Sequence, residues 1–146
     1  MASRSLLDLS EAMYRLAESF VTRLDESGIP YLVICTLRSM EEQDALYAQG
    51  RQPIETVNKK RRAAGLALVD VRQNLKTVTK AKPGDSRHNP DGTGKANALD
   101  IVPLDGGKIV WDADHPLYEQ MGAIGEDCGL TWGGRWRMRD MPHFEI

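Results

Sequence analysis

Ser86-Arg-His-Asn-Pro-Asp-Gly-Thr-Gly-Lys-Ala-Asn-Ala-Leu-Asp100 contains two candidate metal ligands around which the chain is organised, and Asp140-Met-Pro-His143 completes the set. His88 offers a neutral imidazole, Asp100 a carboxylate at the start of an apolar run, and His143 a second imidazole. Three nitrogen and oxygen ligands leave the fourth tetrahedral position of a zinc ion for water, which is typical of catalytic sites, whereas structural sites are closed. The pattern predicts an enzyme with one zinc ion.

Apolar and β-branched runs around these ligands predict a small antiparallel sheet. Tyr31-Leu-Val-Ile-Cys-Thr36 is continuous and of strand length, as expected for a buried strand. Leu104-Asp-Gly-Gly107 separates two further runs, which should pair as a hairpin. Thr131-Trp-Gly-Gly134 is expected to be a loop. The predicted strands are 31–36, 98–103, 108–111 and 143–146.

Helical periodicity and capping residues predict the helices. Asp8 and Glu11 are spaced as a cap and its partner, and Ser39 opens a capping box. Asp114 or His115 should cap the last helix, with a proline in its first turn. An extended Thr77-Val-Thr79 is expected after the fourth helix. The predicted helices are 9–27, 40–50, 53–64, 66–73 and 117–128.

A length of 146 residues suits one domain with a real core, so the expected organisation is a single catalytic domain over residues 1–146. The order of helices and strands predicts an α+β fold. Its architecture is a single compact domain in which a small antiparallel sheet is flanked by helices and the zinc site lies on the sheet.

The charge and cysteine content further narrow the functional class and the cellular compartment expected for the protein. The 19 basic and 21 acidic residues nearly cancel, so no nucleic-acid partner is expected. Cys35 and Cys128 lie far apart in sequence and are expected to be free buried thiols, which suits a reducing cytoplasm. No signal peptide or apolar membrane anchor is recognised at the sequence level.

These residues also carry a resemblance to a known family. Ser86-x-His88, Ala98-x-Asp100, Trp132-Gly-Gly and Asp140-x-x-His143-Phe-Glu resemble the zinc peptidases that include D-alanyl-D-alanine carboxypeptidases and dipeptidases and the L-alanyl-D-glutamate endopeptidases of phage endolysins. The resemblance extends from about Tyr31 to Ile146. Its upstream part consists of Arg38-Ser39, Gln43, Leu46-Tyr-Ala-Gln-Gly-Arg51 and Ala81-Lys-Pro-Gly84.

The chain departs from the family pattern between two of the ligands. The family usually has six residues between its histidine and aspartate, with a glycine four before the acid, whereas eleven separate His88 from Asp100 and Ala96 stands in the glycine's place. Asn89-Pro-Asp-Gly-Thr-Gly94 favours tight turns, so the excess is interpreted as a surface hairpin. Asp91 is the rival metal ligand to Asp100.

The resemblance assigns roles to the other residues. Asp140 would be the general base, and its place three residues before His143 lets it face the attacking water without binding metal. Arg38 would stabilise the oxyanion, unless it only pairs with a nearby glutamate. Ser86 and Trp132 would contact substrate, the alternatives being a turn-forming serine and a core tryptophan.

The resemblance implies a zinc-dependent peptidoglycan peptidase. The expected activity is that of an L-alanyl-D-glutamate endopeptidase, a phage endolysin that acts on the stem peptide in host lysis. It would be a monomer, held in the host cytoplasm until its release to the cell wall. The alternatives are a D-alanyl-D-alanine carboxypeptidase and a non-catalytic cell-wall-binding protein on the same fold.

Overall fold

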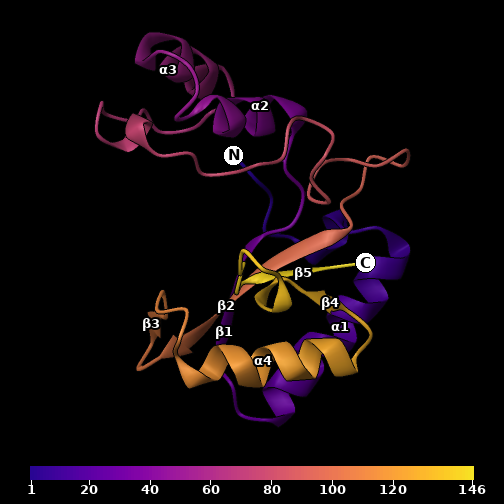
Figure 1. Cartoon of the computed structure of the whole chain (residues 1–146). Helices are drawn as coiled ribbons and strands as arrows, with labels where there is room; N and C mark the ends of the chain where they lie inside the picture. The colour runs from indigo at the N-terminus through magenta and orange to yellow at the C-terminus, as the bar shows by residue number, and fades with distance from the viewer.

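An antiparallel sheet forms the centre of the computed structural model, which describes residues 1–146 (Figure 1). The strand order is β1-β2-β5-β4, and β3 pairs with the far end of β2 as a short hairpin. The strands are β1 (Tyr31–Cys35), β2 (Ala98–Asp105), β3 (Lys108–Ile109), β4 (Thr131–Trp132) and β5 (His143–Glu145). The sheet and its flanking helices confirm the predicted α+β fold.

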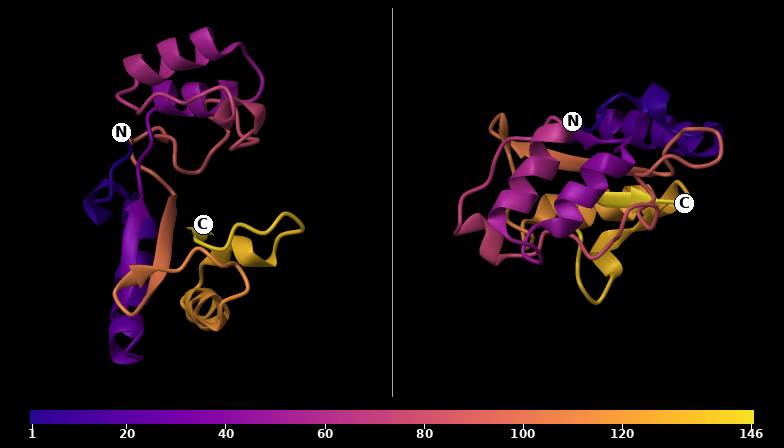
Figure 2. Two further views of the ribbon diagram at one scale, coloured as in Figure 1. Left: turned by 90° about the vertical axis from the view of Figure 1, so that its left-hand side faces the viewer. Right: turned by 90° about the horizontal axis from the view of Figure 1, so that it is seen from above.

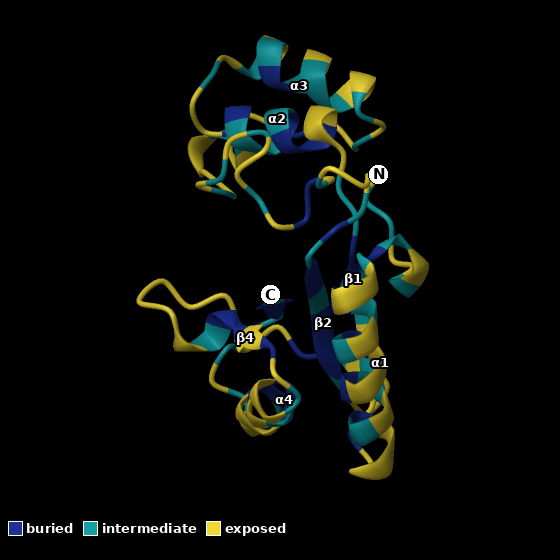
Figure 3. Cartoon of the chain, turned by 90° about the vertical axis from the view of Figure 1, so that its right-hand side faces the viewer, coloured by how far each residue is buried: buried dark blue, intermediate teal, exposed yellow.

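Helices α1 (Glu11–Glu26) and α4 (Pro116–Asp127) pack against the sheet and bury its apolar side chains. The Phe144 ring of β5 lies 4.6 Å from the Phe20 ring of α1, between ring centroids. A side chain on α4 at Gly125 would collide with Phe144, so glycine permits this close approach. Figure 3 shows the result, with β2 buried and the outward face of α1 exposed. Successive side chains of a strand point to opposite faces of the sheet, so Asp100 of β2 and His143 of β5 lie on the face away from the core.

Helices α2 (Met40–Ala48) and α3 (Ile54–Ala63) lie side by side beyond one end of the sheet (Figure 2). They share a small apolar cluster of Ala48, Val57 and Val69, separate from the main core. The connection from α3 back to β2 includes the short 3-10 helix η2 (Gln73–Leu75) and runs between α2 and the end of the sheet before it enters β2 (Figure 1). This connection carries Ser86 and His88 towards the sheet.

The observed N-cap residue is the predicted one at two helices and a different one at a third. The Ser39 side chain accepts a hydrogen bond from the Glu42 N–H at the start of α2, and the His115 ring does so from Leu117 at α4. The prediction of Asp8 as the α1 cap is wrong, because Ser10 fills that position and accepts from the Met13 N–H. Asp8 instead ends the short 3-10 helix η1 (Leu6–Asp8).

The predicted helix at residues 66–73 is also wrong. Gly65 has a φ of +75°, which ends α3, and the Asn58 side chain binds both the N–H and the C=O of Val69. Side chains of α3 therefore satisfy backbone groups that a helix would pair internally. Two other expectations need correction: Thr131 and Trp132 form strand β4 instead of a loop, and β1 is an edge strand with Leu32 exposed.

Candidate metal centre

Three side chains lie in a row across the sheet on the face opposite the main core. Cys35 of β1 and His143 of β5 are the two cross-strand neighbours of Asp100 on β2. His88 reaches this row from the connecting loop, where the Ser86 hydroxyl accepts a hydrogen bond from the His88 N–H at 3.1 Å. The backbone N–H of Arg38 also donates to the His88 carbonyl at 2.8 Å. The fold thus brings together residues that are far apart in sequence.

His88 and His143 both point one ring nitrogen at the same oxygen of Asp100. His88 Nε2 lies 3.0 Å and His143 Nδ1 lies 3.1 Å from Asp100 Oδ1. The outer nitrogens have acceptor partners: His88 Nδ1 donates to the Thr36 carbonyl at 2.7 Å, and His143 Nε2 donates to Glu145 Oε2 at 2.8 Å. A carbonyl and a carboxylate can only accept, so these bonds select tautomers that leave the inner nitrogens as lone pairs.

Three electron-pair donors that face one another require a positive charge between them. Burial disfavours the charged form of His88, but its bonds to Asp100 and Cys35 outweigh burial and raise the pKa of His88 to about 10. Burial likewise acts against ionisation of Asp100, yet the bonds from His143 and His88 lower the pKa of that carboxyl. Protons can supply the charge. A metal cation supplies it while both histidines keep the tautomers that their outer partners favour.

The spacing of the donors is close to that of metal ligands. Two ligands at about 2.1 Å from a tetrahedral zinc ion lie about 3.4 Å apart, and the two histidine nitrogens lie 3.0 and 3.1 Å from Asp100 Oδ1. A second combination is Cys35, His88 and Asp100, whose donor atoms lie within 4.8 Å of one another. However, the His88 nitrogen that faces the Cys35 sulfur already donates to Thr36. The histidine pair with Asp100 therefore suits a metal better.

Asp91, the rival ligand, serves its own loop. Its Oδ1 accepts hydrogen bonds from the N–H and the hydroxyl of Thr93, and its Oδ2 accepts from the Asn97 amide. The hydroxyl and amide bonds lower the pKa of Asp91. Residues 91–95 form a tight turn in which the Asp91 N–H donates to the Lys95 carbonyl, and Asp91 does not line the cavity above the metal centre. The geometry favours Asp100.

Asp140 stands beside the histidine pair without joining it. Its Oδ2 lies 4.0 Å from His143 Nδ1, and its side chain remains 51% exposed. Burial and the negative charge of Asp100 raise the pKa of Asp140. A carboxylate at this distance can take a proton from a water molecule next to the metal position.

Gly133 fixes the position of Asp140. The Gly133 carbonyl accepts a hydrogen bond from the Asp140 N–H at 2.9 Å, and the Asp140 carbonyl accepts one from the His143 N–H at 3.2 Å. A Cβ on Gly133 would lie 2.6 Å from the Asp140 carbonyl oxygen and 3.2 Å from His143 Cβ. The Trp-Gly-Gly motif thus supports the loop that carries Asp140.

Replacing Gly133 with alanine should therefore displace Asp140. We expect a loss of about 1–3 kcal/mol in the free energy of unfolding from overpacking and a fall in turnover at unchanged zinc content. Chemical denaturation and hydrolysis assays measure the two effects. Gly92→Ala is the matched control, since a Cβ there meets no atom within 4 Å. Equal turnover in both variants would show that Gly133 does not position Asp140.

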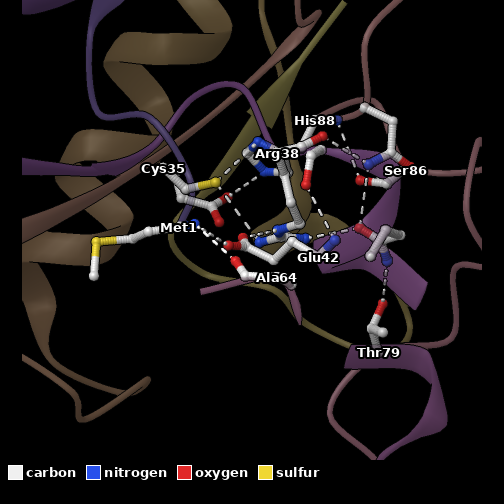
Figure 4. Close-up of polar contacts among 12 residues, drawn as sticks. Met1, Cys35, Arg38, Glu42, Ala64, Thr79, Ser86 and His88 are labelled. Carbon is white, nitrogen blue, oxygen red and sulfur yellow. Dashed lines mark hydrogen bonds and ion pairs between the residues drawn. The ribbon is translucent and has the colours of Figure 1, made fainter. Parts of the chain in front are cut away.

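Arg38 is held by three partners at the start of α2. Its Nη1 donates to Gln43 Oε1 at 3.1 Å, its Nη2 donates to the Cys35 sulfur at 3.6 Å, and its Nε lies 3.4 Å from Glu42 Oε2 (Figure 4). Glu42 is almost fully buried. Arg38 therefore makes the glutamate pairing considered above and still lines the cavity, where a fixed guanidinium can stabilise developing negative charge.

A cavity of about 930 Å³ opens above the metal centre, between the 77–88 segment and the 136–140 loop. Ser86 lines it, together with Arg38 and Asp140. Trp132 does not: it is 1% exposed in the main core, and its indole N–H donates to the Met141 carbonyl. The tryptophan that lines the cavity is Trp136, and its ring centroid lies 5.1 Å from that of His143.

Three residues of the site escaped sequence reasoning. Glu145 orients His143, Cys35 contacts His88, and Trp136 lines the cavity. The Glu145 position was visible as the second residue after the histidine in His-Phe-Glu. Nothing in the sequence alone separates Trp136 from Trp132.

None of the helices has the length and apolar character that a membrane span requires.

Comparisons with known proteins found similarities in sequence and in fold. Residues 79–146, which contain all three donors and Asp140, match the family described as D-alanyl-D-alanine carboxypeptidase. The peptidoglycan L-alanyl-D-glutamate endopeptidase CwlK of Bacillus subtilis (strain 168) is 29% identical, over 95% of this chain and 74% of that protein. The solved structure of the LdcB LD-carboxypeptidase has the same fold, with a TM-score of 0.61 and 14% identity. That match covers 94% of this chain but only 58% of the LdcB chain.

Proposed function

We propose that this chain is a zinc peptidase of the family of D-alanyl-D-alanine carboxypeptidases and L-alanyl-D-glutamate endopeptidases, and that it hydrolyses a peptide bond in the stem peptide of peptidoglycan. The observation that carries the proposal is the convergence of His88, Asp100 and His143 on one point beneath a cavity that Asp140 and Arg38 also line. The match to CwlK over 95% of the chain supports one catalytic domain across residues 1–146.

In this proposal His88 Nε2, Asp100 Oδ1 and His143 Nδ1 hold one zinc ion. Zinc supplies a Lewis acid and lowers the pKa of its water to about 7. Thr36 and Glu145 keep the two imidazoles in the required tautomers and orientations. The Cys35 thiol stays outside the ligand set and supports Arg38.

The remaining steps belong to residues of the chain. Asp140 accepts the proton of the attacking water and later delivers it to the amine that leaves, so the carboxylate is regenerated in each cycle. Arg38 donates hydrogen bonds to the carbonyl oxygen as negative charge develops there. Ser86 lies at the cavity wall and holds the His88 backbone, so it both supports the site and faces the substrate.

The bond that we expect to be cut is L-alanyl-D-glutamate, since the CwlK alignment spans nearly the whole chain. The runner-up is removal of a terminal D-alanine, which the family match at residues 79–146 favours. We further propose that the protein is a phage endolysin, because the motifs of this chain resemble those of phage endolysins. The protein would then act as a monomer that is kept in the host cytoplasm until it is released to the wall.

Mass spectrometry of fragments from purified peptidoglycan tests the proposal. Incubation with the zinc-loaded protein should release fragments with new glutamate amino termini, and a chelator should prevent their release. Loss of terminal D-alanine would assign the carboxypeptidase activity. No cleavage of either kind, with zinc still bound, would contradict the proposal and favour a wall-binding protein.

A further inference from the structure

Residues 77–80 follow the cavity wall with their backbone groups unpaired. Together with Ala81 they line the cavity consecutively. The chain enters this segment in an extended conformation, with φ −118° and ψ 133° at Lys76. None of the N–H or C=O groups of residues 77–80 has a hydrogen-bond partner within the chain. Backbone groups of a folded domain are normally paired with other protein groups or with water, so this segment has a full set of donors and acceptors available.

The segment is nevertheless held in place at both ends by α2 and the residues that follow it. At its start Gly50 approaches so closely that a Cβ would lie 2.7 Å from the Thr77 nitrogen. At its end the Gln43 amide donates to the Ala81 carbonyl at 2.8 Å and to the Thr79 hydroxyl at 3.5 Å (Figure 4). The ends of the segment are therefore fixed while its backbone N–H and C=O groups remain unpaired. Because the segment is already held in place, pairing with a ligand costs less conformational entropy.

The side chains of this segment suit a β-strand that has no partner strand. Thr77, Val78 and Thr79 are β-branched, and Val78 is 54% exposed. Such residues favour strands, yet the segment belongs to no strand of the sheet. Lys80 and Met138 both line the cavity, and Lys80 Nζ lies 2.5 Å from the Met138 sulfur. The 77–80 segment and the 136–140 loop therefore form adjoining parts of the cavity wall.

We propose that residues 77–80 bind the peptide substrate as an added β-strand, through main-chain hydrogen bonds along the cavity wall. The inference rests on the proposed function, because the occupant is the stem peptide whose scissile bond reaches His88, Asp100 and His143. The cavity of about 930 Å³ lies at the upper end of the range for ligand sites. Main-chain pairing reads the amide groups of a peptide, while pockets for its side chains add specificity.

Proline substitution tests this pairing, because it removes one N–H and little else at an extended position. Alternate residues of a strand point their backbone groups to opposite sides, so only one parity can face the peptide. We expect the KM for a synthetic stem pentapeptide to rise about threefold to tenfold in only one of the two variants Val78→Pro and Thr79→Pro, which lie between Thr77, whose nitrogen packs against Gly50, and the bend at Lys80. The alanine variants at the same positions keep the N–H and are the matched controls, and kcat should stay unchanged.

Two results would overturn the inference. One is an equal KM in the proline and alanine variants at both positions. The other is an equal rise in both proline variants, which would indicate a general distortion of the loop. Zinc content and circular dichroism confirm that each variant is folded.

Peptide binding to the Asp140→Ala variant separates this inference from the proposed function. Amide protons of residues 77–80 with a single parity should gain protection from hydrogen exchange when the pentapeptide is added. If the wild-type protein hydrolyses nothing but this protection appears, the strand pairing holds and the proposed function fails. If hydrolysis occurs and no amide of the segment is protected, the pairing is wrong and the proposed function stands.

Discussion

Replacing Asp140 with alanine is expected to abolish hydrolysis while zinc content and folding stay unchanged. Asp140 lies 4.0 Å from His143 Nδ1 and lines the cavity, but its half-exposed carboxylate is not one of the three proposed zinc ligands. Removing a general base typically costs about 10²–10⁴-fold in rate. Turnover of a defined stem peptide measures the effect.

Two controls make the Asp140 result specific. Asp25→Ala removes an exposed carboxylate near the far end of α1 and should leave turnover unchanged. Zinc analysis shows whether the Asp140→Ala protein still binds metal. Full activity in Asp140→Ala would rule out its role as base, and loss of zinc from that variant would make Asp140 a ligand instead.

Replacing Asp100 with asparagine is expected to strip zinc from the protein, whereas Asp91→Asn should retain it. Asp100 Oδ1 is the atom on which both histidine nitrogens converge, and the side chain is largely buried between them. Its loss removes one of three ligands and the negative charge that balances the cation. We expect zinc content to fall from about one ion per chain to near zero, with hydrolysis lost in parallel.

The Asp91→Asn variant is the matched control for the Asp100 prediction. It makes the same chemical change in a carboxylate whose hydrogen bonds all lie within the 91–97 loop. We expect a small loss of stability and full zinc content. Elemental analysis after gel filtration gives the stoichiometry. If Asp91→Asn loses zinc while Asp100→Asn keeps it, the ligand assignment is reversed.

Four of the five strands could be predicted because each depends on local signals, whereas β4 was expected to be a loop. The run Tyr31–Cys35 is apolar throughout, and Asp100 and His143 each begin or continue an apolar strand. Once these segments form one antiparallel sheet, cross-strand pairing places Asp100 beside His143 without further information. The sheet therefore accounts for the proximity of Asp100 and His143, whereas the choice of these residues as metal ligands rests on their chemistry and on the family resemblance.

Most of the errors involve side-chain contacts that join separate segments of the chain. Ser10 rather than Asp8 caps α1, and its hydroxyl also donates to the Asn97 side chain, 87 residues away. Residues 66–73 lose their helix to side chains of α3. Trp132 is buried because Gly122 of α4 leaves room for its ring. Ser10 could have been identified from its place directly before the helix, whereas Asn97, Val69 and Gly122 cannot be identified as partners from the local sequence.

Zinc titration of the metal-free protein, with hydrolysis of a stem peptide as the readout, tests the central claim most directly. The account predicts no hydrolysis after chelation and a linear return of activity that reaches its plateau at one zinc ion per chain. Hydrolysis that persists without metal, or none at full zinc occupancy, would contradict a catalytic zinc centre at His88, Asp100 and His143.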